Sequence, residues 1–203
     1  MPRVSDAKQR LMEAAINLIW ENSYGSTSVD AICAKAKVKK GSFYYFFASK
    51  SDLAVAAMED NWQTKQADLD RVFSPTIPPL ERLTNYFNRV LECQEALQKE
   101  KGYVLGCPLF TLGCEVCTQD QAIRGKVEEI LNRYLKYLET TIRDAHEQRL
   151  IVAPNAAFKA KLLFAYAQGV LTQARILNSL DGVREMSSGA MELLGVTQTA
   201  AAA

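Results

Sequence analysis

The sequence of 203 residues has a single histidine, His146, and no uninterrupted apolar segment near the ~18 residues of a membrane-spanning helix. The first residues also lack the apolar run of a secretory signal, so we expect a cytoplasmic protein. No glycine-rich phosphate loop, cluster of metal ligands or Ser/His/Asp arrangement is visible. We therefore expect no enzymatic activity, no cofactor and no bound metal. An enzyme remains the alternative of a different class.

Acidic residues are scarce near the N-terminus. Residues 1–50 contain eight Lys or Arg against four Asp or Glu, a net charge of +4, whereas the remainder carries −3. No acid occurs between Lys37 and Lys50. This asymmetry is typical of an N-terminal module that contacts a polyanion. An ordinary solvated lysine face is the alternative.

Cysteine is present in an odd number. In a reducing compartment we expect Cys33, Cys93, Cys107, Cys114 and Cys117 to be free thiols. Cys114 and Cys117 form one C-x-x-C pair, but a structural zinc site commonly needs a second pair. A redox motif of the thioredoxin type would need a preceding strand, and none is predicted.

Alternating strand patterns are also lacking, and apolar residues recur at spacings of three and four, which predicts an all-α fold. The segment "SPTIPP" (74–79) predicts a loop. Thr27 with Asp30, and Ser49 with Asp52, have the spacing of helix-capping pairs. We expect helices at about 6–22, 27–36, 50–73, 80–101, 108–117, 119–148, 156–180 and 183–194.

The run of five aromatic residues at 43–47 predicts a further short helix. Helical spacing places Phe43, Phe46 and Phe47 on one face, which packs on the helix at 6–22. Together with the helix before it, this segment predicts a helix-turn-helix unit. The open face carries Lys39, Lys40, Gly41, Ser42, Tyr44 and Tyr45, which suit phosphate and base edges.

The segment "AICAKAKVKKGSFYYFFASKSDL" resembles the DNA-binding signature of the TetR family of bacterial regulators. The match runs through Ile32, Ala36, Val38, Gly41, Tyr44, Phe47, Lys50 and Leu53. Three residues depart from the usual pattern: Cys33, Lys37 at the common turn glycine, and Tyr45 at the usual His. Left-handed backbone at Lys37 would cost about 1 kcal/mol. We expect DNA contacts from Thr27, Ser28, Lys39, Lys40, Gly41, Ser42, Tyr44, Tyr45 and Lys50.

The resemblance implies a DNA-binding domain at 1–50, a ligand-binding and dimerisation domain at 51–197, and a flexible tail at 198–203. It also implies a homodimer that binds a palindromic operator and represses until a small ligand binds, with the helix at 50–73 transmitting the change. The last two long helices, 156–180 and 183–194, would form the dimer surface. Ala165, Ala167, Gly169, Ala174 and Gly189 would permit close approach there, or else pack within one subunit.

The segment "GCPLFTLGCEVC" (106–117) resembles a subgroup of that family in which a Gly-Cys pair opens a helix at the ligand pocket. Some members sense electrophiles or oxidants through the cysteine that Cys107 matches, and Cys117 matches a second cysteine of such sensors. Pro108 suits a first helical turn, where a thiol pKa can be lowered. A buried cysteine that only packs is the alternative. We expect an uncharged or electrophilic effector, and candidate contacts from Trp62, Tyr86, Cys107, Phe110, Cys114, Tyr134 and Tyr166.

A further alternative is an adaptor or ligand-binding protein of the same fold that does not bind DNA. The segment 35–50 disfavours it, because an adaptor has no reason to keep this face rich in lysine and free of acids.

Overall fold

The computed structural model describes the backbone of residues 4–196, and all regular structure in that range is α-helical. The predicted flexible tail at 198–203 lies outside the described residues. None of the helices within 4–196 combines the length and apolar character needed to cross a membrane. The helices are α1 (Val4–Glu21), α2 (Val29–Ala36), α3 (Lys40–Phe46), α4 (Lys50–Val72), α5 (Pro79–Lys101), α6 (Pro108–Val116), α7 (Gln121–Glu147), α8 (Ala156–Leu177), α9 (Asp181–Arg184) and α10 (Met186–Leu194).

Side-chain caps explain several helix starts, and one differs from the prediction. Ser49 Oγ accepts from the backbone N–H of Asp52 at 3.0 Å, as its spacing predicted. At α2 the cap is Ser28, whose Oγ accepts from Ala31 N at 3.0 Å. Thr27 is buried instead, and its hydroxyl donates to Ser23 O at 2.6 Å.

The end of the chain also differs from the prediction. The single helix expected at 183–194 is divided into α9 and α10, which meet at Glu185. The start of α7 is fixed by Asp120, whose Oδ1 accepts from the N–H groups of Ala122 and Ile123, both at 3.0 Å. The other predicted helices lie within about three residues of their observed bounds.

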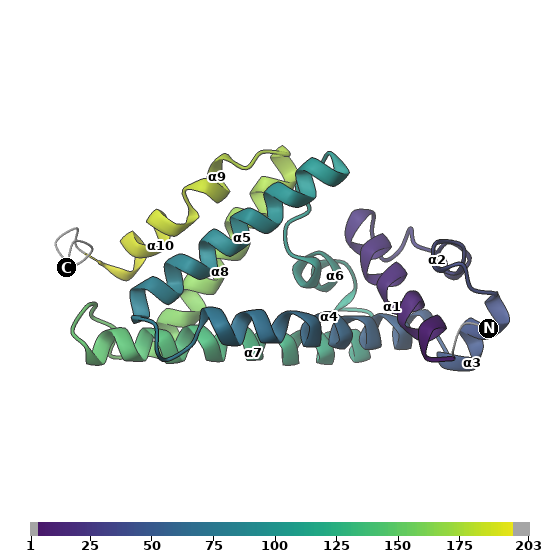
Figure 1. The fold of residues 1–203 in the computed structure, drawn as a ribbon, viewed down its shortest axis with the longest axis horizontal. Coiled ribbons are helices and arrows are strands. Elements are labelled where there is room, and N and C mark those ends of the chain that lie inside the picture. Colours follow the sequence, from purple (N-terminus) through teal and green to yellow (C-terminus); the bar gives the residue numbers. More distant parts are fainter. Residues whose placement is uncertain (1–3, 197–203) are drawn as a thin grey trace. The chain divides into compact units, whose positions relative to one another are not determined.

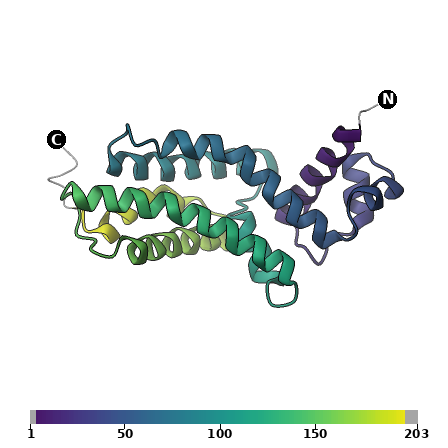
Figure 2. The same ribbon diagram turned by 90° about the horizontal axis from the view of Figure 1, so that it is seen from below.

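The described chain divides into two compact units. The first contains residues up to Gln66 together with Pro108–Ile130, and the second contains Ala67–Cys107 and the residues from Leu131 onward. Both α4 and α7 therefore contribute to each unit. In the first unit α1 packs against α2, α3 and α6, and α2 packs against α3. In Figure 2 these N-terminal helices begin with α1 in purple and lie close together. Fully buried side chains at its centre include Leu11, Ile19, Ile32, Phe43 and Leu53.

The second unit is built from α5, α8, α9, α10 and the adjoining parts of α4 and α7. Within it α10 packs on both α5 and α8, and α9 packs on α8 (Figure 1). Leu83, Phe87, Leu163 and Met186 are almost fully excluded from solvent and form its apolar centre.

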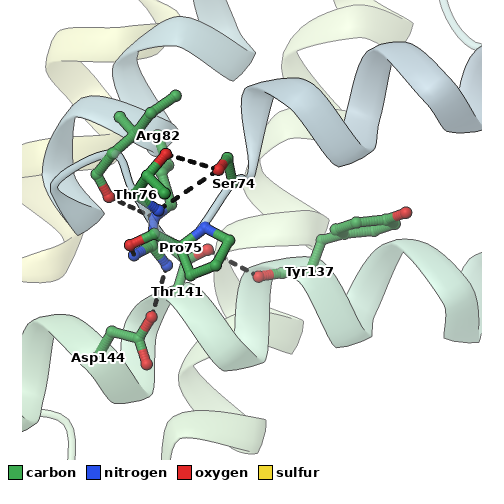
Figure 3. A network of polar contacts seen from close by, with 8 residues as sticks. Ser74, Pro75, Thr76, Arg82, Tyr137, Thr141 and Asp144 are labelled. Carbon is green, nitrogen blue, oxygen red and sulfur yellow. Dashed lines mark hydrogen bonds and ion pairs between the residues drawn. The ribbon is translucent and has the colours of Figure 1, made fainter.

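A buried arginine ties the loop between α4 and α5 to two helices of this unit (Figure 3). Arg82 is 4% exposed, and its Nε donates to Ile77 O at 2.6 Å. Its two terminal nitrogens donate to Pro75 O at 3.1 Å and to the carboxylate of Asp144 on α7. The loop predicted from "SPTIPP" is therefore held at two of its carbonyl oxygens, those of Pro75 and Ile77.

Candidate DNA-binding surface and effector site

The turn between α2 and α3 has the geometry of a helix-turn-helix. Lys37 is left-handed, with φ 54° and ψ 45°, and its N–H donates to Ala34 O at 3.1 Å. The N–H of Val38 donates to Cys33 O at 3.0 Å, which completes a Schellman ending. Lysine thus occupies a position that glycine usually takes, as the sequence predicted.

The aromatic run separates into a buried and an exposed face. Phe43 and Phe47 are buried, Phe46 is half-buried, and Tyr44 and Tyr45 are 56% and 76% exposed. A Cβ added at Gly41 would meet no atom within 4 Å. The exposed face of α3 is therefore open at Gly41, with two phenol groups and Ser42 beside it.

The lysines of this region differ in what they contact. Lys40 forms an ion pair with Asp30 at 2.8 Å, and Lys35 forms one with Glu21 at 3.3 Å. Lys39 is exposed at the N-cap position of α3. Because exposed pairs contribute little energy, Lys40 can exchange Asp30 for a phosphate.

Three residues expected to contact DNA have roles inside the fold. Thr27 is 3% exposed with its hydroxyl bonded internally, and Ser28 caps α2 while remaining exposed. Lys50 Nζ donates to Tyr24 O at 2.9 Å and Thr27 O at 3.0 Å, and lies 4.0 Å from the centre of the Tyr24 ring. Burial lowers the pKa of the Lys50 ammonium. Lys50 thus holds the loop that precedes α2.

The same loop is bound from α6 by a glutamate that sequence reasoning did not single out. The carboxylate of Glu115 accepts from Tyr24 N at 2.7 Å and Gly25 N at 2.6 Å. A Cβ on Gly25 would lie 3.0 Å from Glu115 Oε1, so glycine permits this approach. Glu115 lies in the segment 106–117 that contains Cys107, and this segment was the sequence signal that could have indicated it.

In the second unit, the residues before Cys107 are fixed by α5 and α8. Gly106, at φ +65°, exchanges hydrogen bonds of 2.9 and 3.1 Å with the side-chain amide of Gln94. Leu105 O accepts from Arg175 at 2.8 Å, and Val104 N donates to Asn178 Oδ1 at 2.9 Å. Cys107 itself is half-buried and in no disulfide. Hydrogen bonds from α5 and from the last turn of α8 therefore fix the backbone that leads into Cys107.

Two predicted effector contacts lie close to this thiol. Tyr86 on α5 and Tyr134 on α7 both interact electrostatically with Cys107, and burial, the largest cause, raises the pKa of each phenol well above its ordinary value. The Tyr134 ring lies 6.2 Å from that of Phe164 on α8. Two buried tyrosines, one from α5 and one from α7, thus interact with Cys107.

The other predicted contacts are Tyr166 in the second unit and three residues of the first unit. Tyr166 donates to Met186 O at 3.4 Å and packs on Gly189, where an added Cβ would lie 2.1 Å from its hydroxyl oxygen. Trp62, Phe110 and Cys114 belong to the first unit. Trp62 is buried, Phe110 is half-buried and Cys114 is exposed near the end of α6.

Metal-ligating side chains do not gather in the part of the chain that the structure describes. No group of three or more His, Cys, Asp or Glu side chains there is placed to hold a metal ion. The ring of His146 lies against the turn after α7, where Ala153 N donates to its Nδ1 at 3.3 Å. Burial raises the pKa of the Cys117 thiol, which disfavours the reactive thiolate.

A short helix with an open polar face, preceded by a capped helix and a tight turn, defines a helix-turn-helix DNA-binding protein. Residues 11–57 match the family model described as bacterial regulatory proteins of the TetR family, and residues 79–189 match the tetracycline repressor-like C-terminal domain. The chain therefore belongs to the TetR family and is a DNA-binding transcriptional regulator.

Relatives and solved structures agree with this assignment. The transcriptional repressor DhaR of Mycobacterium sp. is 27% identical over 177 residues, covering 83% of this chain and 82% of DhaR. The repressor NemR of Escherichia coli is 23% identical over 180 residues, 87% of each chain. The crystal structure of reduced E. coli NemR superposes with a TM-score of 0.83 at 19% identity, covering 95% of this chain and 99% of that chain, which shows the shared fold.

Proposed function

We propose that this protein is a homodimeric repressor, located with its DNA in the cytoplasm, that leaves a palindromic operator when an uncharged or electrophilic effector engages the region of Cys107. The open face of α3 would enter the major groove, with Lys39, Gly41, Ser42 and Tyr45 facing the DNA. The relatives are named as regulators, which supports a role without catalysis.

The observation that carries the release mechanism is the contact of Glu115 with the loop before α2. Glu115 lies on α6, and α6 begins one residue after Cys107. A displacement of α6 would move Glu115 away from Tyr24 N and Gly25 N, two charge-assisted hydrogen bonds of 2.7 and 2.6 Å. Because Lys50 holds the same loop, the change would reach both the start of α4 and the start of α2.

The dimer surface proposed for this chain lies on α8. Regulators of this family act as dimers. Phe158, Leu162 and Ile176 are 58%, 40% and 76% exposed, and their positions share one helix face with Ala165 and Gly169. The spacing of four and three residues is that of a helix seam, and the small residues at its middle allow close approach of a second copy. Ala167 and Ala174, expected to assist, are buried within the subunit instead.

Titration of the chain's own upstream DNA by fluorescence anisotropy, before and after N-ethylmaleimide, tests the proposal. The exposed thiols of Cys93 and Cys114 would also react, so both are first replaced by serine. We expect treatment to weaken operator binding at least tenfold and Cys107→Ser to resist it. Binding that survives treatment would assign release to a noncovalent effector. Absence of binding to any DNA from a random-sequence selection would contradict the repressor itself.

A second pair of variants tests the route through α6. Glu115→Gln replaces one carboxylate oxygen by an amide nitrogen, which cannot accept a hydrogen bond, so only one of the two N–H groups keeps its acceptor. We therefore expect a smaller loss of operator affinity on treatment with N-ethylmaleimide. Glu128→Gln, an exposed residue of α7, makes the same change of charge and should behave as the parent. Equal responses of the two variants would argue against transmission by Glu115.

A further inference from the structure

Two glutamines of the second unit are equally buried but are satisfied differently. Gln94 is 4% exposed, and its amide makes hydrogen bonds from both ends, to the N–H and C=O of Gly106. Gln168 on α8 is 5% exposed, and its carbonyl oxygen Oε1 has no hydrogen-bond donor among the described residues. Buried acceptors without a partner are rare, since each costs about 1–3 kcal/mol.

The position of Gln168 on α8 relates it to the Cys107 region. One turn earlier, Phe164 places its ring 6.2 Å from that of Tyr134. One turn later, the backbone of Leu171 lies against Gly106, with its carbonyl oxygen 3.0 Å from the site of an added Cβ. All three α8 residues are buried on the same face. Gln168 therefore lies between the turn that meets Tyr134 and the turn that meets the residue preceding Cys107.

The structure assigns Gln168 Oε1 as the acceptor for the effector, and from this we infer that the effector is an uncharged molecule with a hydroxyl or amide N–H donor. This inference rests on the proposed effector-released repressor and specifies what it binds. A carboxylate has two acceptor oxygens and no donor, so it would bring them against Gln168 Oε1, which is itself an acceptor. An ammonium group could donate but would lose its hydration among apolar and aromatic side chains. A neutral donor satisfies the carbonyl without either cost.

The surrounding side chains support a neutral ligand with an apolar body. Tyr86, Tyr134 and Phe164 supply aromatic surface, and the pKa values of both phenols are raised by burial, so this region disfavours charge. Neutral effectors that donate to Gln168 would need no reaction with Cys107. Covalent and noncovalent release could then act on the same segment.

Matched pairs of small probes test this assignment on the full-length dimer by calorimetric titration. Each pair shares a body but differs in its donor: phenol and anisole, cyclohexanol and methoxycyclohexane, benzyl alcohol and benzyl methyl ether. We expect at least one hydroxyl compound to bind about two- to tenfold more tightly than its ether, the effect of one neutral hydrogen bond. None of the six compounds is an alkylating agent. Equal binding within every pair, or no binding of any hydroxyl compound, would overturn the inference.

Variants at the two glutamines separate ligand binding from folding. Gln168→Met removes an unpaired oxygen, so we expect a thermal midpoint no lower than that of the parent and loss of the preference for the hydroxyl compound. Gln94→Met removes two hydrogen bonds and should lower the midpoint. A drop for Gln168→Met as large as that for Gln94→Met would show that Oε1 is already paired. Operator binding is measured separately, so a protein that fails to bind DNA but keeps the probe preference contradicts only the repressor.

Discussion

Arg82 of α5 binds Asp144 of α7 while also donating to the carbonyl oxygens of Pro75 and Ile77. The guanidinium side chain is 4% exposed, so removing either charged partner leaves buried polar groups unpaired. We expect Arg82→Met to lower the free energy of unfolding by roughly 3–5 kcal/mol, measured by urea denaturation. Arg143→Met is the control, because Arg143 pairs with Glu139 at the surface and should change stability by less than about 1 kcal/mol. A similar loss in both variants would contradict the special role of Arg82.

The left-handed lysine in the helix-turn-helix offers a stabilising substitution. Lys37 has φ 54°, where an L side chain is strained and glycine is not. We expect Lys37→Gly to raise the free energy of unfolding by about 1 kcal/mol. In contrast, Lys35→Gly, inside α2, should lower it by about 1 kcal/mol. Thermal denaturation of both variants gives the signs, and a destabilised Lys37→Gly would refute the strain.

The salt dependence of operator binding distinguishes lysines that contact phosphate from lysines that hold the fold. Lys39 is exposed at the start of α3, so Lys39→Ala should weaken binding to all DNA and flatten the slope of log affinity against log salt by about one unit. Lys50 is occupied by two carbonyl oxygens. We expect Lys50→Met to reduce affinity with the slope nearly unchanged, and to lower the thermal midpoint. The opposite pattern of slopes would restore the phosphate role for Lys50.

The cap of α7 predicts a defined acid dependence. Hydrogen bonds from Ile123 N, Ser51 and Ala122 N lower the pKa of Asp120 below its ordinary value of 3.8. The unfolded chain therefore binds the proton more readily, so the stabilisation is complete above that value and is lost as pH falls through the folded pKa. Asp120→Ala should cost about 1 kcal/mol at pH 7. Its difference from the parent, followed by urea denaturation, should shrink below about pH 4; a constant difference would contradict the linkage.

The exposed seam of α8 predicts the oligomeric state. Leu162→Glu places a charge at its middle, and we expect a shift from dimer to monomer in sedimentation velocity together with weaker operator binding. Ala157→Glu, which is exposed on the other side of α8, adds the same charge and should remain dimeric. A dimer that persists in Leu162→Glu would place the interface elsewhere.

The helices were predictable from local sequence because apolar spacing, caps and breakers agree with one another along most of the chain. The two exceptions have local causes. Thr27 and Ser28 are both residue types that cap helices, and the structure places Thr27 in the interior and Ser28 at the cap. Glu185, where α9 meets α10, carries no breaker residue such as Gly or Pro, so periodicity alone could not separate the two helices.

The sites were less predictable because their residues pair over long separations. The open face of α3 follows from helical spacing within seven residues, and it was anticipated. The contact of Glu115 with Gly25 joins residues 90 positions apart, and the segment 106–117 that contains Glu115 does not indicate this partner. Likewise, a buried glutamine has the same appearance in sequence whether it is paired, as Gln94 is, or unpaired at its carbonyl, as Gln168 is. Tyr166 was grouped with the effector contacts by aromatic character, which does not reveal that it packs on Gly189.

The clamped glycine at position 106 has a consequence for how such a regulator can diversify. Its backbone is held by the Gln94 amide and lies against Leu171 O, and its positive φ excludes other residues without strain. The backbone at the neighbouring Cys107 thus depends on main-chain geometry, whereas the tyrosines that interact with its thiol come from α5 and α7. Under the proposed function, substitutions at Tyr86, Tyr134 or Gln168 would change which effector binds, while the backbone before Cys107 keeps its position. The side chains near Cys107 can therefore be exchanged, by evolution or by design, without a change in the backbone that Gly106 fixes.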